Sequence, residues 1–348
     1  MSSSARTHPR SPERIRLAHG GGGSATAELL NSLVLPKLSN PTLDALGDSA
    51  ILAAPPGERL AFTTDSFVVR PPIFPGGDLG RIAICGTIND LAVAGAEPLA
   101  LSMALIIEEG FETELFERIV SSAASTAREA GVPVVTGDTK VVERGAADGL
   151  FITTTGIGQL PPGPHPSPDR VRQGDTVLVS GPLAEHGVAV LLEREGIPVS
   201  APIESDVAPL AETIATMRAA VGPEAIRWMR DPTRGGLATA LDDLARAAGL
   251  AVLIEESKLP IRPPVRGALE ILGLDPLHVP SEGRFVAVVA PDAARPALDA
   301  LSRQPLCQDA AIIGRIEAAP ARRAVLDTLM GGRRFIDAPT GELLPRIC

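Results

Sequence analysis

From Arg59 onward, short apolar runs typical of strands alternate with longer runs of helical periodicity. The β-rich runs predict strands over about 60–69, 99–107, 132–135 and 150–158. The helical runs predict helices over about 79–94 and 113–130, and in the second helix Phe116, Ile119 and Val120 share one face. Gly131 supplies the left-handed residue that ends such a helix. The first half of the chain is therefore expected to form an α/β unit.

A proline-rich stretch, Leu160-Pro161-Pro162-Gly163-Pro164-His165-Pro166-Ser167-Pro168, separates this unit from the rest. Its prolines remove backbone donors and oppose helix, so we expect a linker over 160–170. Beyond it we predict strands over 175–180, 250–254, 284–289 and 310–316, and helices over 184–195, 208–221 and 237–248. The second half, 171–335, is thus also expected to be an α/β domain. Residues 1–16 are expected to be a disordered arm, 17–36 a glycine-rich segment, 37–159 the first domain and 336–348 a flexible tail.

Composition narrows the class of protein. The 348 residues are 45% hydrophobic and 21% charged, as in soluble globular proteins, and aromatics are only 3%, with no tyrosine. The net charge of -10 argues against nucleic acid as a partner. The apolar stretch 91–107 is interrupted by Glu97-Pro98, and 1–16 lacks the apolar core of a signal peptide. We expect no membrane association and a cytoplasmic location.

Three cysteines stand far apart, at Cys85, Cys307 and Cys348, and their spacing fits neither a disulfide framework nor a metal knuckle. Cys85 and Cys307 lie in apolar or helical surroundings and are expected to be small buried hydrophobic residues. Cys348 closes the chain after Pro345-Arg346-Ile347. It is either a thiol carried into an active site or simply the residue that happens to be last.

Acidic residues recur where predicted strands give way to turns, at Asp48, Asp65 and Asp138, and Asp90 lies within a predicted helix. Strand ends gather ligands from separate segments, and Mg²⁺ prefers a few carboxylates together with phosphate oxygens and water. The sequence therefore predicts a magnesium and phosphate site. The alternative for each single aspartate is an Asx turn or a helix cap.

Glycine-rich segments provide two further candidates. The run Gly20-Gly21-Gly22-Gly23 either cradles phosphates with backbone amides or acts as a flexible hinge. Arg234-Gly235-Gly236 opens a predicted helix and either offers phosphate a planar donor group or serves as a simple helix entry. Glu282 precedes the strand near 285–289 and is either a catalytic base or a surface partner of Arg284.

Taken in order, several motifs resemble one family. They are Thr64-Asp65-Ser66, the segment 85–92, Gly137-Asp138-Thr139-Lys140, Asp231-Pro232-Thr233-Arg234-Gly235-Gly236 and the final Pro345-Arg346-Ile347-Cys348. They are similar to HypE, the carbamoyl dehydratases of [NiFe]-hydrogenase maturation, within the aminoimidazole-ribonucleotide-synthetase-like ATP-binding superfamily. The acidic motifs are shared across the superfamily, whereas the terminal Pro-Arg-Ile-Cys points to HypE. The resemblance covers the chain from about Leu17 to its last residue. At Ser24 and Ser281 this sequence has residues that differ from those common in the family.

The resemblance implies a two-domain α/β fold of the α+β type. Its N-terminal mixed sheet would dimerise into a β-barrel, and its C-terminal domain would be an α/β sandwich followed by the flexible tail. A carbamoyltransferase, HypF, would load a carbamoyl group onto Cys348, and ATP would convert it to a thiocyanate. Cyanide would then pass to iron held by the HypC-HypD scaffold. These partners, the homodimer and the cofactors ATP and Mg²⁺ are expectations from the resemblance.

The resemblance also assigns roles to residues. Cys348 would be the carrier, Glu282 the candidate base, and Lys140 and Arg234 phosphate neutralisers. The metal residues would be Asp48, Asp65, Asp90 and Asp138. The nucleotide site would add Gly21, Gly22, Gly23, Asn89, Thr139 and Gly235. Two rivals remain at this point: another superfamily enzyme, such as selenophosphate synthetase or a small-molecule kinase, and a non-catalytic adaptor whose tail docks on a partner.

Overall fold

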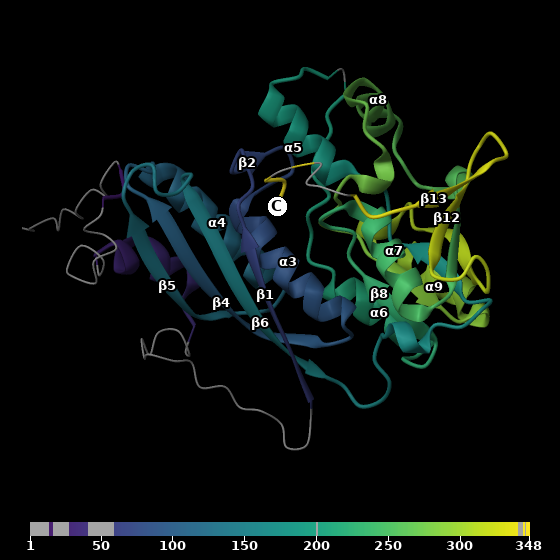
Figure 1. Ribbon diagram of the computed structural model, residues 1–348. Coiled ribbons are helices and arrows are strands. Elements are labelled where there is room, and N and C mark those ends of the chain that lie inside the picture. Colours follow the sequence, from purple (N-terminus) through teal and green to yellow (C-terminus); the bar gives the residue numbers. More distant parts are fainter. Residues whose placement is uncertain (1–13, 17–27, 41–58, 200, 340–343, 345) are drawn as a thin grey trace, which may run out of the picture.

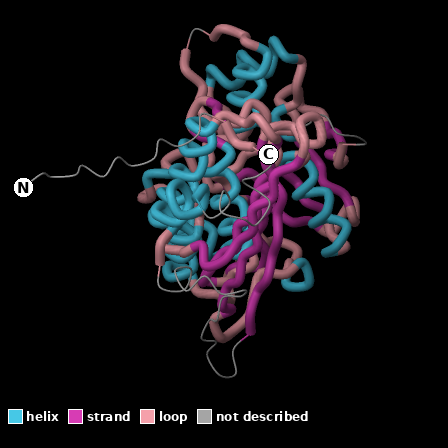
Figure 2. The backbone as a smooth tube through the Cα atoms, turned by 90° about the vertical axis from the view of Figure 1, so that its left-hand side faces the viewer, coloured by secondary structure: helices cyan, strands magenta, loops and turns pink. Residues whose placement is uncertain are grey.

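The computed structural model describes residues 14–16, 28–40, 59–199, 201–339, 344 and 346–348 (Figure 1). It has two halves, each built from a sheet and helices, as the hydrophobic pattern predicts. The end of the chain lies between these halves in Figure 1 and beside the long strands of the first half in Figure 2. Four predicted site residues, Gly21, Gly22, Gly23 and Asp48, lie outside the described residues.

The first half is built on a sheet whose described strands run in the order β1-β6-β4-β5. Their bounds are β1 Arg59–Phe67, β4 Glu97–Glu108, β5 Val134–Val142 and β6 Leu150–Leu160. The β4–β5 pair is parallel, and the β1–β6 and β4–β6 pairs are antiparallel. The other elements are η2 Leu30–Val34, α2 Leu35–Leu38, the short hairpin β2 Ile73–Phe74 and β3 Gly77–Asp78, α3 Leu79–Val93 and α4 Thr113–Glu129.

Helices α3 and α4 cover one face of this sheet and form its core. α3 begins at Asp78, whose carboxylate accepts a hydrogen bond from the Arg81 amide, and almost all of its residues are buried. α4 is amphipathic and turns Phe116 and Ile119 inward. On the opposite face Phe62 is 71% exposed. Within the described residues, that face has no layer of its own, which is unusual for a sheet carrying apolar side chains.

The second half contains a sheet with the described order β13-β12-β9-β11-β7-β10-β8. Its strands are β7 Thr176–Val179, β8 Ile226–Arg230, β9 Ala251–Glu255, β10 Val286–Val289, β11 Ala311–Glu317, β12 Arg323–Asp327 and β13 Arg333–Ile336. Its helices are α5 Glu185–Glu195, α6 Ala211–Val221, α7 Gly236–Ala248, α8 Pro263–Leu272 and α9 Ala294–Leu301. Short 3-10 turns are η4 Pro168–Arg170, η5 Glu256–Lys258, η6 Pro276–His278, η7 Pro291–Ala293 and η8 Pro305–Cys307. β12 pairs with β9 in parallel, and the remaining pairs are antiparallel.

Some sequence predictions differ from the structure. β5 continues to Val142 rather than ending near 135, so Asp138 lies inside a strand and not at its end. Asp65 is likewise inside β1, since its neighbours remain paired with β6. Strands β8, β12 and β13 and helices α8 and α9 were not predicted. The predicted disordered arm does not extend over 14–16, because Ile15 is fully buried and its amide donates to the Phe111 carbonyl.

The linker region is fixed to the second half. The Arg170 guanidinium donates to the carbonyls of His165, Glu224 and Ile226, and the Ser167 amide donates to the Arg227 carbonyl. No helix among the described residues is both long and apolar enough to cross a membrane.

Candidate active site

A cavity of about 250 Å³ lies between the two halves. Its walls come from β1 and α3 on one side and from the loops after β8 and η6 on the other, and the end of the chain closes it. It is lined by Asp65, Ser66, Phe67, Gly86, Asp90, Arg230, Asp231, Thr233, Arg234, Glu282 and Cys348. Predicted residues from five distant segments therefore meet in one place.

The first wall carries two aspartates on regular elements. β6 residue Thr154 lies opposite Asp65 and hydrogen-bonds Thr87 of α3, so this face of β1 looks toward that helix. Asp90 projects from α3, where it accepts a hydrogen bond of 2.8 Å from the Thr63 hydroxyl. Burial first, and then repulsion by the Asp90 carboxylate and a hydrogen bond shared with it, raise the pKa of Asp65 to about 6.

The second wall carries two more carboxyl groups, both on loops. Asp231 follows β8 directly and is buried. Burial, followed by repulsion from Asp90, raises its pKa to about 7. Glu282 is 2% exposed, and burial together with the carboxylates of Asp231, Asp206 and Asp65 raises its pKa well above the usual range. Its Oε1 has no hydrogen-bond partner in the described part of the chain. The cavity thus brings four carboxyl groups together.

Arg234 is the positive residue that faces these acids. Its guanidinium is 3.7 Å from Asp65 and its side chain is 70% exposed. Gly235 and Gly236 stand at the start of α7 with φ angles of 77° and 62°. Residues that carry a Cβ rarely adopt such positive φ angles. A Cβ on Gly236 would stand 2.5 Å from the Leu277 carbonyl oxygen, so glycine is needed for this close passage.

Asn89 of α3 lies inside the protein. It is fully buried, and its Nδ2 donates to the carbonyls of Ala208 and Glu282, while its Oδ1 accepts from the Leu210 amide. These three hydrogen bonds engage both polar atoms of the Asn89 side chain with main-chain groups of the protein. Asn89 therefore joins α3 to the Glu282 loop, and its predicted role at the nucleotide stays a prediction.

Asp138, Thr139 and Lys140 are not brought to the cavity within one chain. They lie on β5, which is three strands away from β1 in the sheet. The two strands are therefore roughly 14 Å apart in total. Asp138 is in register with Ser66 rather than Asp65, so it points to the opposite face of the sheet. The Asp138 carboxylate accepts a hydrogen bond from the Thr139 amide.

The end of the chain lies along the segment after β1. The Val68 amide donates to the Cys348 carbonyl and the Arg70 amide to the Arg346 carbonyl, each at 3.1 Å. The Arg346 Nε donates to the Val68 carbonyl, and its guanidinium pairs with Asp148. Ile347 is 3% exposed and belongs to the first hydrophobic core. Cys348 is half-buried at the cavity, whereas Cys85 and Cys307 are fully buried, as predicted.

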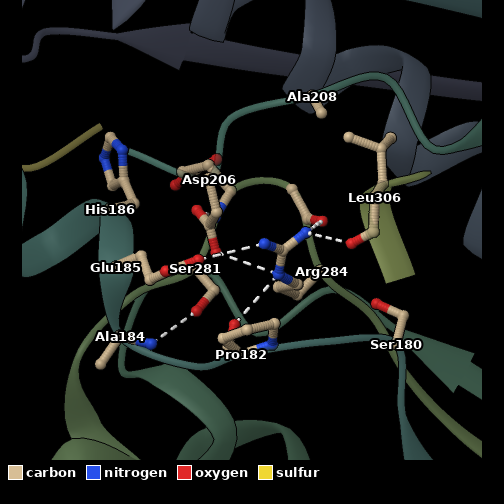
Figure 3. Close-up of polar contacts among 12 residues, drawn as sticks. Ser180, Pro182, Ala184, Glu185, His186, Asp206, Ala208, Ser281, Arg284 and Leu306 are labelled. Carbon is tan, nitrogen blue, oxygen red and sulfur yellow. Dashed lines mark hydrogen bonds and ion pairs between the residues drawn. The ribbon is translucent and has the colours of Figure 1, made fainter. Parts of the chain in front are cut away.

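Two acidic residues of this region were missed by sequence reasoning. Asp231 belongs to a quoted motif, but it was not selected because β8, the strand that delivers it, was not predicted. Asp206 lies in a coil segment, and its Oδ1 accepts from the Glu282 amide at 2.9 Å. Its Oδ2 lies 3.7 Å from Nε of Arg284, which also binds Glu185 (Figure 3). A single sequence contains no signal for Asp206.

The fold and the acidic cavity define an enzyme of the aminoimidazole ribonucleotide (AIR) synthase type. The model for the AIR synthase related protein N-terminal domain matches residues 46–160, and the model for its C-terminal domain matches 172–327. Carbamoyl dehydratase HypE of Azotobacter vinelandii is 49% identical over 334 residues, which cover 96% of this chain and 97% of that protein. The chain belongs to the HypE family of carbamoyl dehydratases.

Solved structures agree with this assignment. The crystal structure of the hydrogenase maturation protein HypE in complex with ATP superposes with a TM-score of 0.92 at 42% identity, covering 96% of this chain and all of that one. HypE in the HypE-HypF complex superposes with a TM-score of 0.78 at 42% identity, covering 91% of this chain and all of that one.

Proposed function

We propose that this chain uses ATP to dehydrate a carbamoyl group on the Cys348 sulfur to a thiocyanate, which supplies cyanide ligands for the iron of [NiFe]-hydrogenase. The observation that carries the proposal is the position of Cys348, which lines the same cavity as Asp65, Asp90, Asp231 and Glu282. A thiol at this place presents a group bound to it directly to the acidic site. The family and its ATP-bound member support the use of ATP.

The reaction balances in two steps. The amide oxygen of the S-carbamoyl group attacks the γ-phosphorus of ATP, the bond from that phosphorus to ADP breaks, and one nitrogen proton leaves. The result is an S-bound imidate whose oxygen carries the phosphoryl group. The second nitrogen proton then leaves as the carbon–oxygen bond breaks, which gives thiocyanate and phosphate. The oxygen of the lost water ends in the phosphate, so free water must be kept away from the γ-phosphate.

Glu282 is suited to removing the nitrogen protons. Its buried carboxyl has a raised pKa and an Oε1 that no described protein group occupies. A carboxylate of high pKa is a strong proton acceptor once it is ionised. Arg234 lies opposite, near Asp65, and its planar guanidinium suits the charge of a transferring phosphoryl group. Cys348 of the docked tail forms part of the cavity lining beside them.

The acidic cavity fits a hard divalent cation such as Mg²⁺. Asp65, Asp90 and Asp231 gather with little positive charge between them, and burial and mutual repulsion raise the pKa values of Asp65 and Asp231. The described residues contain no closed group of three protein ligands around a single point. Mg²⁺ usually takes one or two protein carboxylates and completes its shell with phosphate oxygens and water. Bound there, the cation would neutralise charge on the phosphates.

The working unit is proposed to be a homodimer in which the sheets of two copies join face to face into a barrel. The face of the first sheet without helices carries exposed Leu60, Phe62 and Ile106, which favours a second copy as its cover. Asp138 lies on this face by its register, and Lys140 follows two positions along β5. The proposal is that these residues complete the site of the other subunit.

The carbamoyl group would come from the carbamoyltransferase HypF, and the cyanide would pass to the HypC-HypD scaffold. The solved HypE-HypF complex supports the first partner. A test of the function is the intact mass of the C-terminal peptide after incubation with HypF, carbamoyl phosphate and ATP. We expect the mass to rise by one carbamoyl group and then to fall by one water. An ATP turnover that never changes this mass would overturn the proposal.

Truncation after Ile347 tests the rival enzymes of the superfamily. The tail lies where a free small substrate would need to enter, because Cys348 lines the cavity itself. We expect the truncated chain to bind nucleotide and make no product. Unchanged turnover with a free small substrate would favour a kinase or synthetase, and nucleotide binding without any dependence on Mg²⁺ would favour an adaptor.

Mixing two inactive variants tests the shared site. In a mixed dimer of Lys140→Ala and Cys348→Ala chains, one site has an intact Cys348 from one chain and an intact Lys140 from the other. We expect the mixture to recover dehydration that neither variant shows alone. If Lys140 serves its own chain, no mixed dimer contains a complete site and the mixture stays inactive.

A further inference from the structure

The last peptide of the chain is held by a histidine that the motifs do not include. His186 lies in the first turn of α5 and is fully buried. Its Nε2 is 2.8 Å from the carbonyl oxygen of Ile347, and its Nδ1 is 2.8 Å from the hydroxyl of Ser205. The ring meets Phe74 edge to face at 5.4 Å. Both ring nitrogens thus have one partner each, and one of these partners belongs to the tail.

The partners determine where the ring proton lies. The Ile347 carbonyl only accepts hydrogen bonds, so Nε2 must carry the proton. The Ser205 oxygen accepts from the Val207 amide at 3.2 Å and therefore donates its own hydrogen to Nδ1. Burial lowers the pKa of His186, which favours the neutral ring that this pattern requires. A directional series of donors runs from Val207 through Ser205 and His186 to Ile347.

The carbonyl that His186 binds belongs to the peptide plane joining Ile347 to Cys348. Because this unit is planar, fixing its oxygen fixes the orientation of the whole plane. The Ile347 side chain is buried in the core, which prevents rotation of the preceding residue. The Val68 amide also holds the main-chain oxygen of Cys348, so this residue is held on both sides where it lines the cavity.

The same segment also supports the second cavity wall. Asp206 follows Ser205 directly and accepts the hydrogen bond of the Glu282 amide. Figure 3 shows His186 and Asp206 close to the buried pair of Glu185 and Arg284. Residues 205–206 therefore contact both the group that holds the tail and the backbone of the candidate base.

We propose that His186 is a positioning residue, which donates a hydrogen bond to the Ile347 carbonyl and thereby presents the Cys348 sulfur and its cargo to Glu282. This inference rests on the proposed function, since it assigns a role within the same site. His186 contacts a main-chain carbonyl and not the group carried on the sulfur. It therefore serves the free, carbamoylated and cyanated tail alike.

Two substitutions of His186 distinguish loss of its hydrogen bond to Ile347 from loss of side-chain packing. The amide nitrogen of glutamine reaches the place of Nε2, whereas that of asparagine reaches only the place of Nδ1. We expect His186→Asn to raise the alkylation rate of Cys348 by iodoacetamide about 10-fold, the effect of losing one hydrogen bond with a buried carbonyl left unpaired. His186→Gln should keep the rate near that of the parent chain. Cys85 and Cys307, both fully buried, serve as internal controls for folding in the same mass spectrum.

A second measurement is the single-turnover conversion of carbamoylated chain to thiocyanate. We expect His186→Asn to slow it by a similar factor and His186→Gln to restore it, with ATP binding unchanged in both. Ser205→Ala, which leaves the ring without its orienting donor, should give an intermediate alkylation rate, and it keeps the test available if a His186 variant fails to fold. Equal alkylation rates in the parent and all variants would overturn the inference. Absence of thiocyanate in the parent chain would instead reject the proposed function and leave the alkylation contrast to decide the role of His186.

Discussion

The two walls of the cavity hold the same kind of residue in different ways. On the first wall, Asp65 and Asp90 project from a strand and a helix whose backbones are fixed by regular hydrogen bonds. On the second wall, Asp231 and Glu282 stand on loops. These loops depend on side chains for their shape, with Asn89 and Asp206 holding the Glu282 backbone.

We expect this difference in support to correspond to a difference in role, between ATP binding and the dehydration step. A carboxylate on regular structure has a backbone fixed by main-chain hydrogen bonds, which suits the binding of the nucleotide and its cation. A carboxylate on a side-chain-supported loop is connected through Asp206 and the adjacent Ser205 to the tail that brings the substrate. We infer that Asp65 and Asp90 on the first wall act together with Asp231 in binding the nucleotide and its cation, and that Glu282 on the second wall acts in turnover.

The largest expected effect comes from replacing one acid on each wall. Glu282→Gln keeps the volume of the side chain and removes the base, so we expect single-turnover dehydration to fall by about 100- to 10,000-fold. Asp90→Asn should instead weaken Mg²⁺-dependent ATP binding. Calorimetric titration with ATP and rapid-quench kinetics measure the two quantities on the same preparations. The division between the walls is refuted if both variants lose binding and turnover in equal proportion.

The next effect concerns the support of the second wall. Arg284 is buried between Glu185 and Asp206, and Arg284→Met would leave both carboxylates without this partner. We expect a loss of about 3–5 kcal/mol in the free energy of unfolding. The matched control in the first half is Arg81→Met, because Arg81 pairs with the half-exposed Glu129, and we expect a loss of about 1 kcal/mol. Urea denaturation measures both, and similar losses would contradict the contrast.

The smallest effect is the response of the nucleotide-free protein to pH. The pKa values of Asp65 and Asp231 are raised from 3.8 to about 6 and about 7, so the folded state binds more protons than the unfolded state between about pH 4 and 7. Stability is therefore lost as the pH rises through this range. We expect the unfolding temperature to fall over that interval and Asp231→Asn to flatten the slope.

Added Mg²⁺ and ATP provide the control for this pH dependence. Their binding requires ionised carboxylates, so they should release protons and protect the fold most at the upper end of the range. A stability that rises between pH 5 and 7 without ligand would show that the two aspartates are ionised in the empty cavity.

Sequence reasoning succeeded where local periodicity controls the structure. α4 was predicted from its apolar face and terminal glycine, and the observed helix Thr113–Glu129 differs by one residue at its end. The motifs also selected Asp65, Asp90, Arg234, Glu282 and Cys348, which meet at the cavity. The position of Asp90 within a helix was predicted correctly, whereas Asp65 and Asp138 lie within strands and not at strand ends.

Other features depend on contacts between distant segments and leave no local pattern. Asp206 matters because its oxygen meets the Glu282 amide, 76 positions away. In the sequence, nothing distinguishes His186 from other residues in the first turn of a helix. Only the fold brings it into contact with Ile347. Lys140 was predicted for the site, yet β5 lies across the sheet from β1, so only a second subunit would give it that role.

The backbone pairing of the tail with Val68 and Arg70 has a consequence for delivery of the product. On the proposed function the tail has to leave this position to pass on its cyanide, and both amides and the core space of Ile347 would then open to solvent in each cycle. An acceptor protein that offered the tail an equivalent strand edge and apolar socket would offset the cost of this exposure. We therefore expect the acceptor and the first half of this protein to compete for the segment from Arg346 to Cys348.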